Sequence, residues 1–401
     1  MSAEAKARVL FVDDEPLVLN LLRQAVKMMH QDWEGVFASS GDEALKHMAA
    51  QPFDVIVSDM RMPGMSGAQL LNEVMRLYPA TVRIVLSGYA EQETVLRCVG
   101  STHQFLAKPV DFRALSAMLK RVTNLRQRLH SEEIRQLVGQ KKSLPALPKV
   151  YFEILDALAE PDCSVERIGQ IVATDPGLTA KLLQLVNSAF FGFAHEVSSA
   201  EEATVLLGTG TIRSLALSLH LFSAFEIPKT EGCSLEEIWS HSLRVARLAQ
   251  RIAHLEGADE TLLEEAFTSG LLHDIGKLLL ADCPSTHYLD LFVQAHKENR
   301  SLLELETQAL HATHAEVGAY LLDLWGLPLP LVEAVAWHHA PAQAGSAVFS
   351  ALTAVHVANV LEHTGQANPA PANLNQLDQS YLEQLSLGNR VEAWQRELAN
   401  V

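Results

Sequence analysis

The sequence predicts an α/β domain with a doubly wound, parallel five-stranded sheet, followed by an all-α helical domain. In the first 124 residues, short apolar segments alternate with segments of helical periodicity, which is typical of a parallel sheet with connecting helices. After residue 148 the strand-like segments stop, and helix-like segments follow one another to the end. A chain of 401 residues is long enough for each of these domains to bury its own core.

Four short apolar segments are the clearest predicted strands. They cover residues 8–12, 53–58, 82–86 and 105–107. Between them, apolar residues recur at helical spacing from Leu17 to Met29, and Gly41 opens a second helix. Strands that alternate with helices in this way pair in parallel and place helices on both faces of the sheet.

Polar side chains follow the predicted strands at the point where each strand ends. They are Asp13 and Asp14, then Asp59, then Ser87 and finally Lys108. Because the carboxyl ends of parallel strands meet at one edge of the sheet, we expect these side chains to lie together. A single aspartate after a strand is usually a turn residue or a helix cap. Five suitable residues in this order indicate a phosphoryl-transfer site instead.

The chemistry of such a site follows from its charges. Crowded carboxylates repel one another unless a cation lies between them, and hard oxygen ligands favour Mg²⁺. Asp59 would then be the nucleophile that accepts a phosphoryl group as an acyl phosphate. Ser87 and Lys108 would hydrogen-bond and neutralise the transferred group. We predict these three as catalytic residues and Mg²⁺ as the cofactor.

Residues 6–124 resemble the receiver domain of two-component response regulators. Four stretches carry the resemblance: residues 9–15 (VLFVDDE), 59–67 (DMRMPGMSG), 86–89 (LSGY) and 105–109 (FLAKP). It implies that Asp59 is the phosphoacceptor, that Phe105 and Ser87 form the switch, and that a sensor histidine kinase or another phosphodonor is a partner. The implied Mg²⁺ ligands are Asp13, Asp14, Asp59 and the backbone carbonyl of Arg61.

Residues 125–143 are predicted to be a helical linker. The pattern from Asp111 to about residue 140 is one long helix, with Leu115, Val122 and Leu129 seven residues apart. Two heptads fit either a dimerising helix or a last receiver helix that packs on its own sheet, and both interpretations stay open. Prolines at 145 and 148 end this segment.

Histidines concentrate in the helical region that follows. The candidate metal ligands are His241, His273, Asp274, His314, His338 and His339. Imidazoles and a carboxylate from several helices are typical of a metal site inside a helix bundle. Because the chain has 17 histidines, ordinary hydrogen-bonded histidines remain the alternative interpretation.

Residues 144–340 resemble the HDOD module, a helical signalling domain related to the HD superfamily of metal-dependent phosphohydrolases. The matching stretches are residues 144–148 (LPALP), 175–179 (DPGLT), 187–190 (NSAF), 239–242 (WSHS), 270–277 (GLLHDIGK), 314–318 (HAEVG) and 325–328 (WGLP). The resemblance implies a non-enzymatic output or interaction domain. Residues 341–401 are predicted to be a C-terminal helical extension that packs on this module.

Two departures from the HD pattern weaken a catalytic interpretation. Asn359 stands where the pattern has a carboxylate, so one anionic ligand is missing. The residues after the paired histidines read APAQ at 340–343, without the Gly-Tyr-Pro signature of the related cyclic-dinucleotide phosphodiesterases. The surviving histidines and Asp274 are therefore interpreted as a vestigial site for iron, manganese or zinc.

The leading hypothesis is a response regulator in which phosphorylation of Asp59 controls a non-catalytic output module that binds an unknown protein partner, with a homodimer as one form. The alternative is a phosphorylation-gated, metal-dependent phosphohydrolase of the HD type or a cyclic-dinucleotide-binding sensor. A net charge of −17 argues against extended contact with nucleic acid. We also expect a cytoplasmic protein without a membrane segment, because no apolar run is long enough to span a bilayer.

Overall fold

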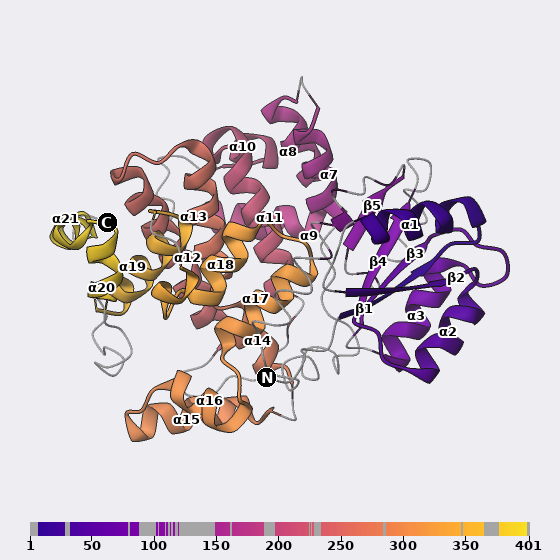
Figure 1. Ribbon diagram of the computed structural model, residues 1–401. Coiled ribbons are helices and arrows are strands. Elements are labelled where there is room, and N and C mark those ends of the chain that lie inside the picture. Colours follow the sequence, from indigo (N-terminus) through magenta and orange to yellow (C-terminus); the bar gives the residue numbers. More distant parts are fainter. Residues whose placement is uncertain are drawn as a thin grey trace. The chain divides into compact units, whose positions relative to one another are not determined.

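The chain forms two compact units, with the main division between residues 146 and 147, and each unit is described by itself (Figure 1). The computed structural model describes residues 7–28, 33–78, 81–87, 102, 104–108, 110, 113, 115–116, 119, 149–160, 163–187, 197–223, 225, 227, 234–283, 286–345, 348–364 and 377–398. The predicted linker, residues 125–143, and the second of the proposed heptads lie outside these residues.

A parallel sheet of five strands in the order β2-β1-β3-β4-β5 forms the first unit, which confirms the predicted fold class. The strands are β1 (Ala7–Val12), β2 (Trp33–Ala38), β3 (Val55–Asp59), β4 (Val82–Ser87) and β5 (Gln104–Ala107). In this order the chain reverses direction across the sheet between β1 and β3. Ligands of open parallel sheets bind at such a reversal, beside the carboxyl ends of the strands.

The edge strand β2 was not among the four segments predicted from apolar content. Its sequence, WEGVFA, mixes exposed and half-buried residues, and only Trp33 and Ala38 are buried. An edge strand has a neighbour on one side only, so part of its length faces solvent. By contrast, all five residues of β3 are buried.

Three helices cover the sheet: α1 (Pro16–Met28), α2 (Gly41–Ala50) and α3 (Gly67–Leu77). Figure 1 shows α1 on one face and α2 and α3 on the other, as the alternation of strands and helices predicts. Buried side chains of β1 and β3, such as Leu10 and Ile56, share one core with Leu70 of α3. This core holds the carboxyl ends of β1 and β3 in place.

The second unit is helical, as predicted, in the part that the structure describes. Its helices are α7 (Lys149–Leu158), α8 (Val165–Ala173), α9 (Pro176–Val186), α10 (Ala200–Leu207), α11 (Thr209–Ser223), α12 (Leu235–Leu255), α13 (Glu260–Leu272), α14 (Ile275–Ala281), α15 (Tyr288–Glu298), α16 (Leu302–Leu310), α17 (His314–Leu324), α18 (Leu329–Trp337), α19 (Ala351–Thr364), α20 (Gln379–Gln384) and α21 (Val391–Leu398), with short 3-10 helices η3 (Pro341–Ala344) and η4 (Gly388–Arg390). None of the helices described is both long and apolar enough to cross a bilayer.

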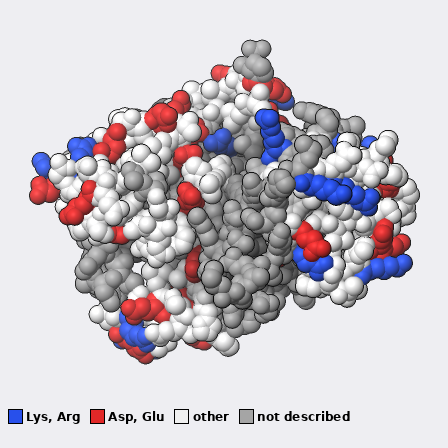
Figure 2. All heavy atoms as spheres, in the orientation of Figure 1, with Lys and Arg blue, Asp and Glu red and all other residues white. Residues whose placement is uncertain are grey.

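The centre of the helical unit is the packing of α12, α13 and α19 against one another. Small residues such as Ala249, Ala266 and Ala358 line this interface and allow the helices to approach closely. Acidic and basic side chains are interspersed with uncharged ones over the described surface of this unit in Figure 2. The buried stripe of α12 also carries His241, which brings a polar side chain into the interior.

The last two helices, α20 and α21, share this core. Tyr381 and Trp394 are fully buried among the side chains of α12 and α19. The indole N–H of Trp394 donates to Glu256 at 3.0 Å, and Arg390 Nε donates to the same oxygen at 2.8 Å. The C-terminal helices therefore form part of the helical unit.

Trp394→Ala is expected to lower the free energy of unfolding by about 3–5 kcal/mol, because it removes a fully buried indole and leaves a cavity. Urea unfolding of the full chain, followed by circular dichroism, measures the change. Arg396→Ala is the control, since the Arg396 side chain is 79% exposed. Equal stability of the two variants would contradict a core that includes α21.

Candidate functional sites

The predicted phosphoacceptor cluster lies at the carboxyl ends of β1 and β3. These strands pair in parallel with Val12 opposite Ser58, so Asp13 and Asp59, the next residues along each strand, meet at the same edge. Lys108 follows β5, and its Nζ lies 3.1 Å from Asp13 Oδ2 and also contacts Asp59 Oδ1. The structure thus brings together three of the predicted site residues from three strands.

Burial and charge oppose each other in this cluster. Asp13 is fully buried, and burial raises its pKa, while the backbone N–H of Glu15 and the charge of Lys108 offset part of that effect. Burial lowers the pKa of Lys108, but the hydrogen bond and the charges of Asp59 and Asp13 outweigh it, so the pKa is raised. Two carboxylates and one ammonium leave a net negative charge that suits a divalent cation.

The other predicted receiver residues are Asp14, Arg61, Ser87 and Phe105. Asp14 is partly exposed beside Asp13, and the backbone N–H of Arg61 donates to Asp59 Oδ2 at 3.2 Å. Ser87 ends β4 and Phe105 lies in β5, but their side chains lie outside the described ones. The roles assigned to Ser87 and Phe105 therefore stay predictions. The residues that would hold Mg²⁺ are Asp13, Asp14, Asp59 and Arg61.

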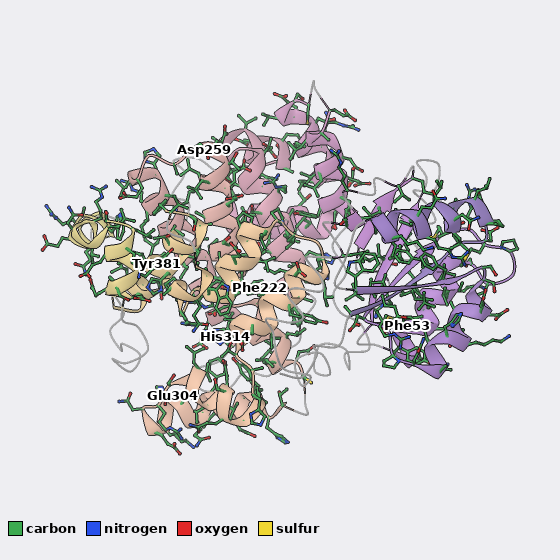
Figure 3. All side chains as sticks on the ribbon, in the orientation of Figure 1. Phe53, Phe222, Asp259, Glu304, His314 and Tyr381 are labelled. Atoms are coloured by element: carbon green, nitrogen blue, oxygen red, sulfur yellow. The ribbon has the colours of Figure 1, made fainter. Side chains whose placement is uncertain are left out.

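A histidine-aspartate cluster lies inside the helical unit, where helices from distant parts of the chain converge. His314, one of its members, is labelled in Figure 3. Its centre is the junction of α13 and α14, which carries His273 and Asp274. Four side chains from three further places reach this junction: His241 on α12, His314 at the start of α17, and His338 and His339 after α18.

Asp274 is the anionic centre of the cluster. One oxygen, Oδ2, lies 2.6 Å from Lys277 Nζ, 3.4 Å from His273 Nε2 and 3.6 Å from His241 Nε2. The other oxygen, Oδ1, lies 3.3 Å from His314 Nε2. The ammonium of Lys277 therefore favours the ionised form of this carboxylate, and three imidazole nitrogens lie within 3.6 Å of it.

The four buried histidines turn the same ring nitrogen toward one another. Each Nδ1 lies 2.8 Å from an oxygen that can only accept: Gly270 O for His273, Val335 O for His338, Glu306 for His314 and Glu362 for His241. Each Nδ1 therefore carries the hydrogen, and in a neutral ring the lone pair is on Nε2. The second nitrogen of each ring is the one available to bind a metal.

The spacing of these lone pairs requires a cation or a proton between them. His273 Nε2 lies 3.2 Å from His241 Nε2, and His314 Nε2 lies 3.1 Å from His339 Nε2. Two nitrogen ligands about 2.1 Å from one tetrahedral ion are about 3.4 Å apart, so both pairs fit a shared metal. His338 Nε2 is buried and has no hydrogen-bond partner among the described residues.

Burial keeps most of the cluster in the protonation state that metal ligands need. His273 is fully buried, and burial lowers its pKa to about 3. Burial also lowers the pKa of His338 and His339 well below the ordinary value. Burial opposes ionisation of Asp274, but interactions with His273 and Lys277 hold its pKa well below the ordinary value. Burial lowers the pKa of His314 too, but the charge of Glu306 and hydrogen bonds to Asp274 and Glu306 outweigh it, so this pKa is raised. Neutral His273, His338 and His339 with one ionised carboxylate are a ligand set for a divalent ion.

The residues present therefore fit a metal ion. Two groups offer ligand atoms within 4.8 Å of one another, His241–His273–Asp274 and His314–His338–His339. Nitrogen donors with one carboxylate suit zinc, manganese or iron. Asn359 lies on α19, 3% exposed, and its Oδ1 has no hydrogen-bond partner among the residues described. Its amide supplies no negative charge.

A glycine makes the close packing of α14 against α17 possible. A Cβ on Gly276 would lie 1.9 Å from His314 O, a distance that no side chain can occupy. Because Gly276 lies two residues after Asp274, this contact also sets the distance between Asp274 and His314. The sequence alone carried no signal for it.

Gly276→Ala is expected to lower the free energy of unfolding by about 1–3 kcal/mol, because α14 and α17 must separate to admit the methyl group. Urea unfolding of the full chain measures the effect. Gly388→Ala is the matched control, since a Cβ there meets nothing nearer than 3.6 Å, and its change should stay within about 0.5 kcal/mol. Equal effects at the two positions would show that the α14–α17 contact is not tight.

Comparison with known proteins now assigns both units. The model of the response regulator receiver domain matches residues 9–120, and the model of the HDOD domain matches residues 144–341. The chain is a response regulator with a receiver domain and an HDOD output domain. Each assignment agrees with the resemblance noted in the sequence.

Relatives of known structure match the HDOD unit. A putative phosphohydrolase from Shewanella amazonensis is 28% identical, with a TM-score of 0.52 over 68% of this chain and 95% of that chain. An HDOD domain protein of unknown function from Geobacter sulfurreducens is 21% identical, with a TM-score of 0.56 over 69% of this chain and 94% of that chain, and shows the fold alone.

Curated relatives match only part of their own length. The hydrogenase transcriptional regulatory protein HoxA of Cupriavidus necator is 37% identical over 109 residues, which are 27% of this response regulator and 22% of HoxA. An uncharacterized protein of Treponema pallidum is 28% identical over 196 residues, 49% of this chain and 37% of that protein.

Proposed function

We propose that phosphorylation of Asp59 controls the HDOD unit, which acts by binding a protein partner rather than by catalysis. The observation that carries the receiver half is the contact of Lys108 with both Asp59 and Asp13. An oxygen of Asp59 forms a bond to phosphorus as the bond from phosphorus to the donor's leaving group breaks. Lys108 then neutralises charge on the transferred group. Bound Mg²⁺ would add further positive charge at the same place.

The burial of the histidine-aspartate cluster supports an interaction output. His273 and His338 are at most 1% exposed, and so is Asp274. Lys277 already places an ammonium 2.6 Å from Asp274. A phosphodiester substrate has no direct access to the Nε2 atoms in this arrangement, and Asn359 lacks the charge that would help to hold a metal.

A metal-dependent phosphohydrolase is the second candidate function, and the inward-facing Nε2 atoms favour it. His241, His273 and Asp274 would hold one ion, and His314, His338 and His339 offer a second group. A bound metal would polarise a phosphoester and activate water. The likeness to a putative phosphohydrolase supports this candidate as well.

The partners follow from the same proposal. A sensor histidine kinase or a small phosphodonor would supply the phosphoryl group, as the response regulator family implies. The protein partner of the HDOD unit would recognise a surface that phosphorylation changes, and a homodimer is one form of that response. We place the protein in the cytoplasm, where such kinases deliver their phosphoryl groups.

Asp59→Asn is expected to abolish labelling by acetyl phosphate and Mg²⁺, because an amide cannot form the acyl phosphate. Intact-mass spectrometry detects the added phosphoryl group, and hydroxylamine should remove it from the protein that carries Asp59. Asp42→Asn is the control, since Asp42 is exposed in the first turn of α2. Labelling of the Asp59→Asn variant at the level of the control would refute the assignment of the phosphoacceptor.

Metal content tests the second candidate function, the metal-dependent phosphohydrolase. If the HDOD unit binds metal, the full chain loaded with Mn²⁺ or Zn²⁺ should retain near-stoichiometric ion after desalting, as measured by elemental mass spectrometry. His273→Gln should then reduce the content to background, while His287→Gln, whose side chain is 79% exposed, should not. No retained metal in any of the three proteins would refute the phosphohydrolase candidate.

A further inference from the structure

Two buried glutamates that belong to none of the sequence motifs contact the histidine-aspartate cluster from outside. Glu306 on α16 is fully buried, and Glu362 on α19 is 7% exposed. Burial of an ionised carboxylate costs several kcal/mol unless charges or hydrogen bonds compensate for it. Each of the two has a histidine of the cluster as a partner.

Glu306 is held entirely by the two helices that flank α16. Its carboxylate accepts from the backbone N–H of His314 at 2.9 Å, from His314 Nδ1 at 2.8 Å and from the hydroxyl of Tyr288. Tyr288 begins α15 and His314 begins α17. The α15–α16 pair therefore places the Glu306 carboxylate against Nδ1 of His314, on the side of the ring away from Asp274.

Glu362 is bound in a similar way by two residues of α12. Its Oε2 lies 2.8 Å from His241 Nδ1, and its Oε1 accepts from Arg244 Nε at 2.7 Å. The guanidinium of Arg244 neutralises this carboxylate. Among the described residues, no lysine or arginine forms an ion pair with Glu306, so no cationic side chain of that kind neutralises its charge.

We propose that Glu306 and Glu362 are positioning residues, which hold His314 and His241 with Nε2 directed at Asp274 as ligands of a divalent metal ion. The inference deepens the second candidate function and rests on it. A carboxylate that accepts from the far nitrogen of a ligating histidine fixes the tautomer and strengthens the donor atom. Glu306 thereby supplies, from outside the ligand set, negative charge that Asn359 does not supply.

The other two rings show why glutamates are needed at these places. His273 and His338 donate to the carbonyls of Gly270 and Val335, three residues earlier in their own helical segments. His241 and His314 donate to carboxylates from other parts of the chain instead. All four rings therefore carry a hydrogen on Nδ1. Backbone carbonyls of the same helical segment fix it in His273 and His338, and glutamates from other helices fix it in His241 and His314.

The test compares Co²⁺ affinities of the full chain by competition with a chelating indicator. Glu306→Gln keeps the size of the side chain and removes its charge, and is expected to weaken binding about 10–100-fold. Glu362→Gln should have a smaller effect, because Arg244 already neutralises Glu362. Glu304→Gln is the matched control, because Glu304 lies on the same helix and its side chain is exposed. Glu304 is labelled in Figure 3. Equal affinities for Glu306→Gln and Glu304→Gln would overturn the proposal.

A second readout does not need the metal. In the metal-free chain with nitrogen-15-labelled histidine, NMR spectra report which nitrogen of each ring carries the hydrogen. The Nδ1–H form of His314 should predominate in the unmodified chain and in Glu304→Gln, and its signal should shift or broaden in Glu306→Ala. An unchanged signal would overturn the positioning role. If the unmodified chain binds no Co²⁺, the phosphohydrolase candidate fails, and this spectrum still decides whether Glu306 positions the ring.

Discussion

The helical unit depends on one buried carboxylate, that of Asp274. An ionised carboxylate at 1% exposure is stable only where cationic groups or hydrogen bonds surround it. Lys277 on α14 supplies the ammonium next to it. His241 on α12 and His314 on α17 place Nε2 within 3.6 Å of the same carboxylate, where a shared proton or metal ion would add further positive charge. The close packing of α14 at Gly276 keeps these groups within reach of one another. The packing of the helices and the electrostatics of the cluster therefore require each other.

The histidines around Asp274 are held in place by groups of the protein itself. Each buried ring is held through Nδ1 by a carbonyl or a carboxylate, so little side-chain freedom remains to be lost when Nε2 binds a cation. Histidines without a role in binding would not need a fixed partner for every Nδ1. Metal binding and an interaction output are compatible, because a buried ion can stabilise one conformation of the unit without meeting a substrate.

Both units pair an aspartate with a lysine, but the two pairs face different surroundings. In the receiver, Lys108 is 27% exposed at the open edge of the sheet, and the partly exposed Asp14 lies beside the cluster. A small phosphodonor can approach that edge. In the HDOD unit, Asp274 is 1% exposed and its partner Lys277 is 15% exposed. The pair of Asp59 and Lys108 is therefore suited to accept a phosphoryl group from a donor in solvent. The pair of Asp274 and Lys277 is suited to stabilise one conformation of the helical unit.

The sequence by itself determined the fold classes and the position of the phosphoacceptor cluster. Alternating strands and helices dictate a parallel sheet, and parallel strands bring Asp13 and Asp59 to one edge whatever the details of packing. The edge strand Trp33–Ala38 escaped recognition because half-exposed strands lack a continuous apolar run. Only the tertiary structure decided the roles of Glu306 and Glu362. Glu362 meets its histidine across 121 residues of sequence, and helical periodicity fixes which face a side chain occupies but not which distant helix packs against it.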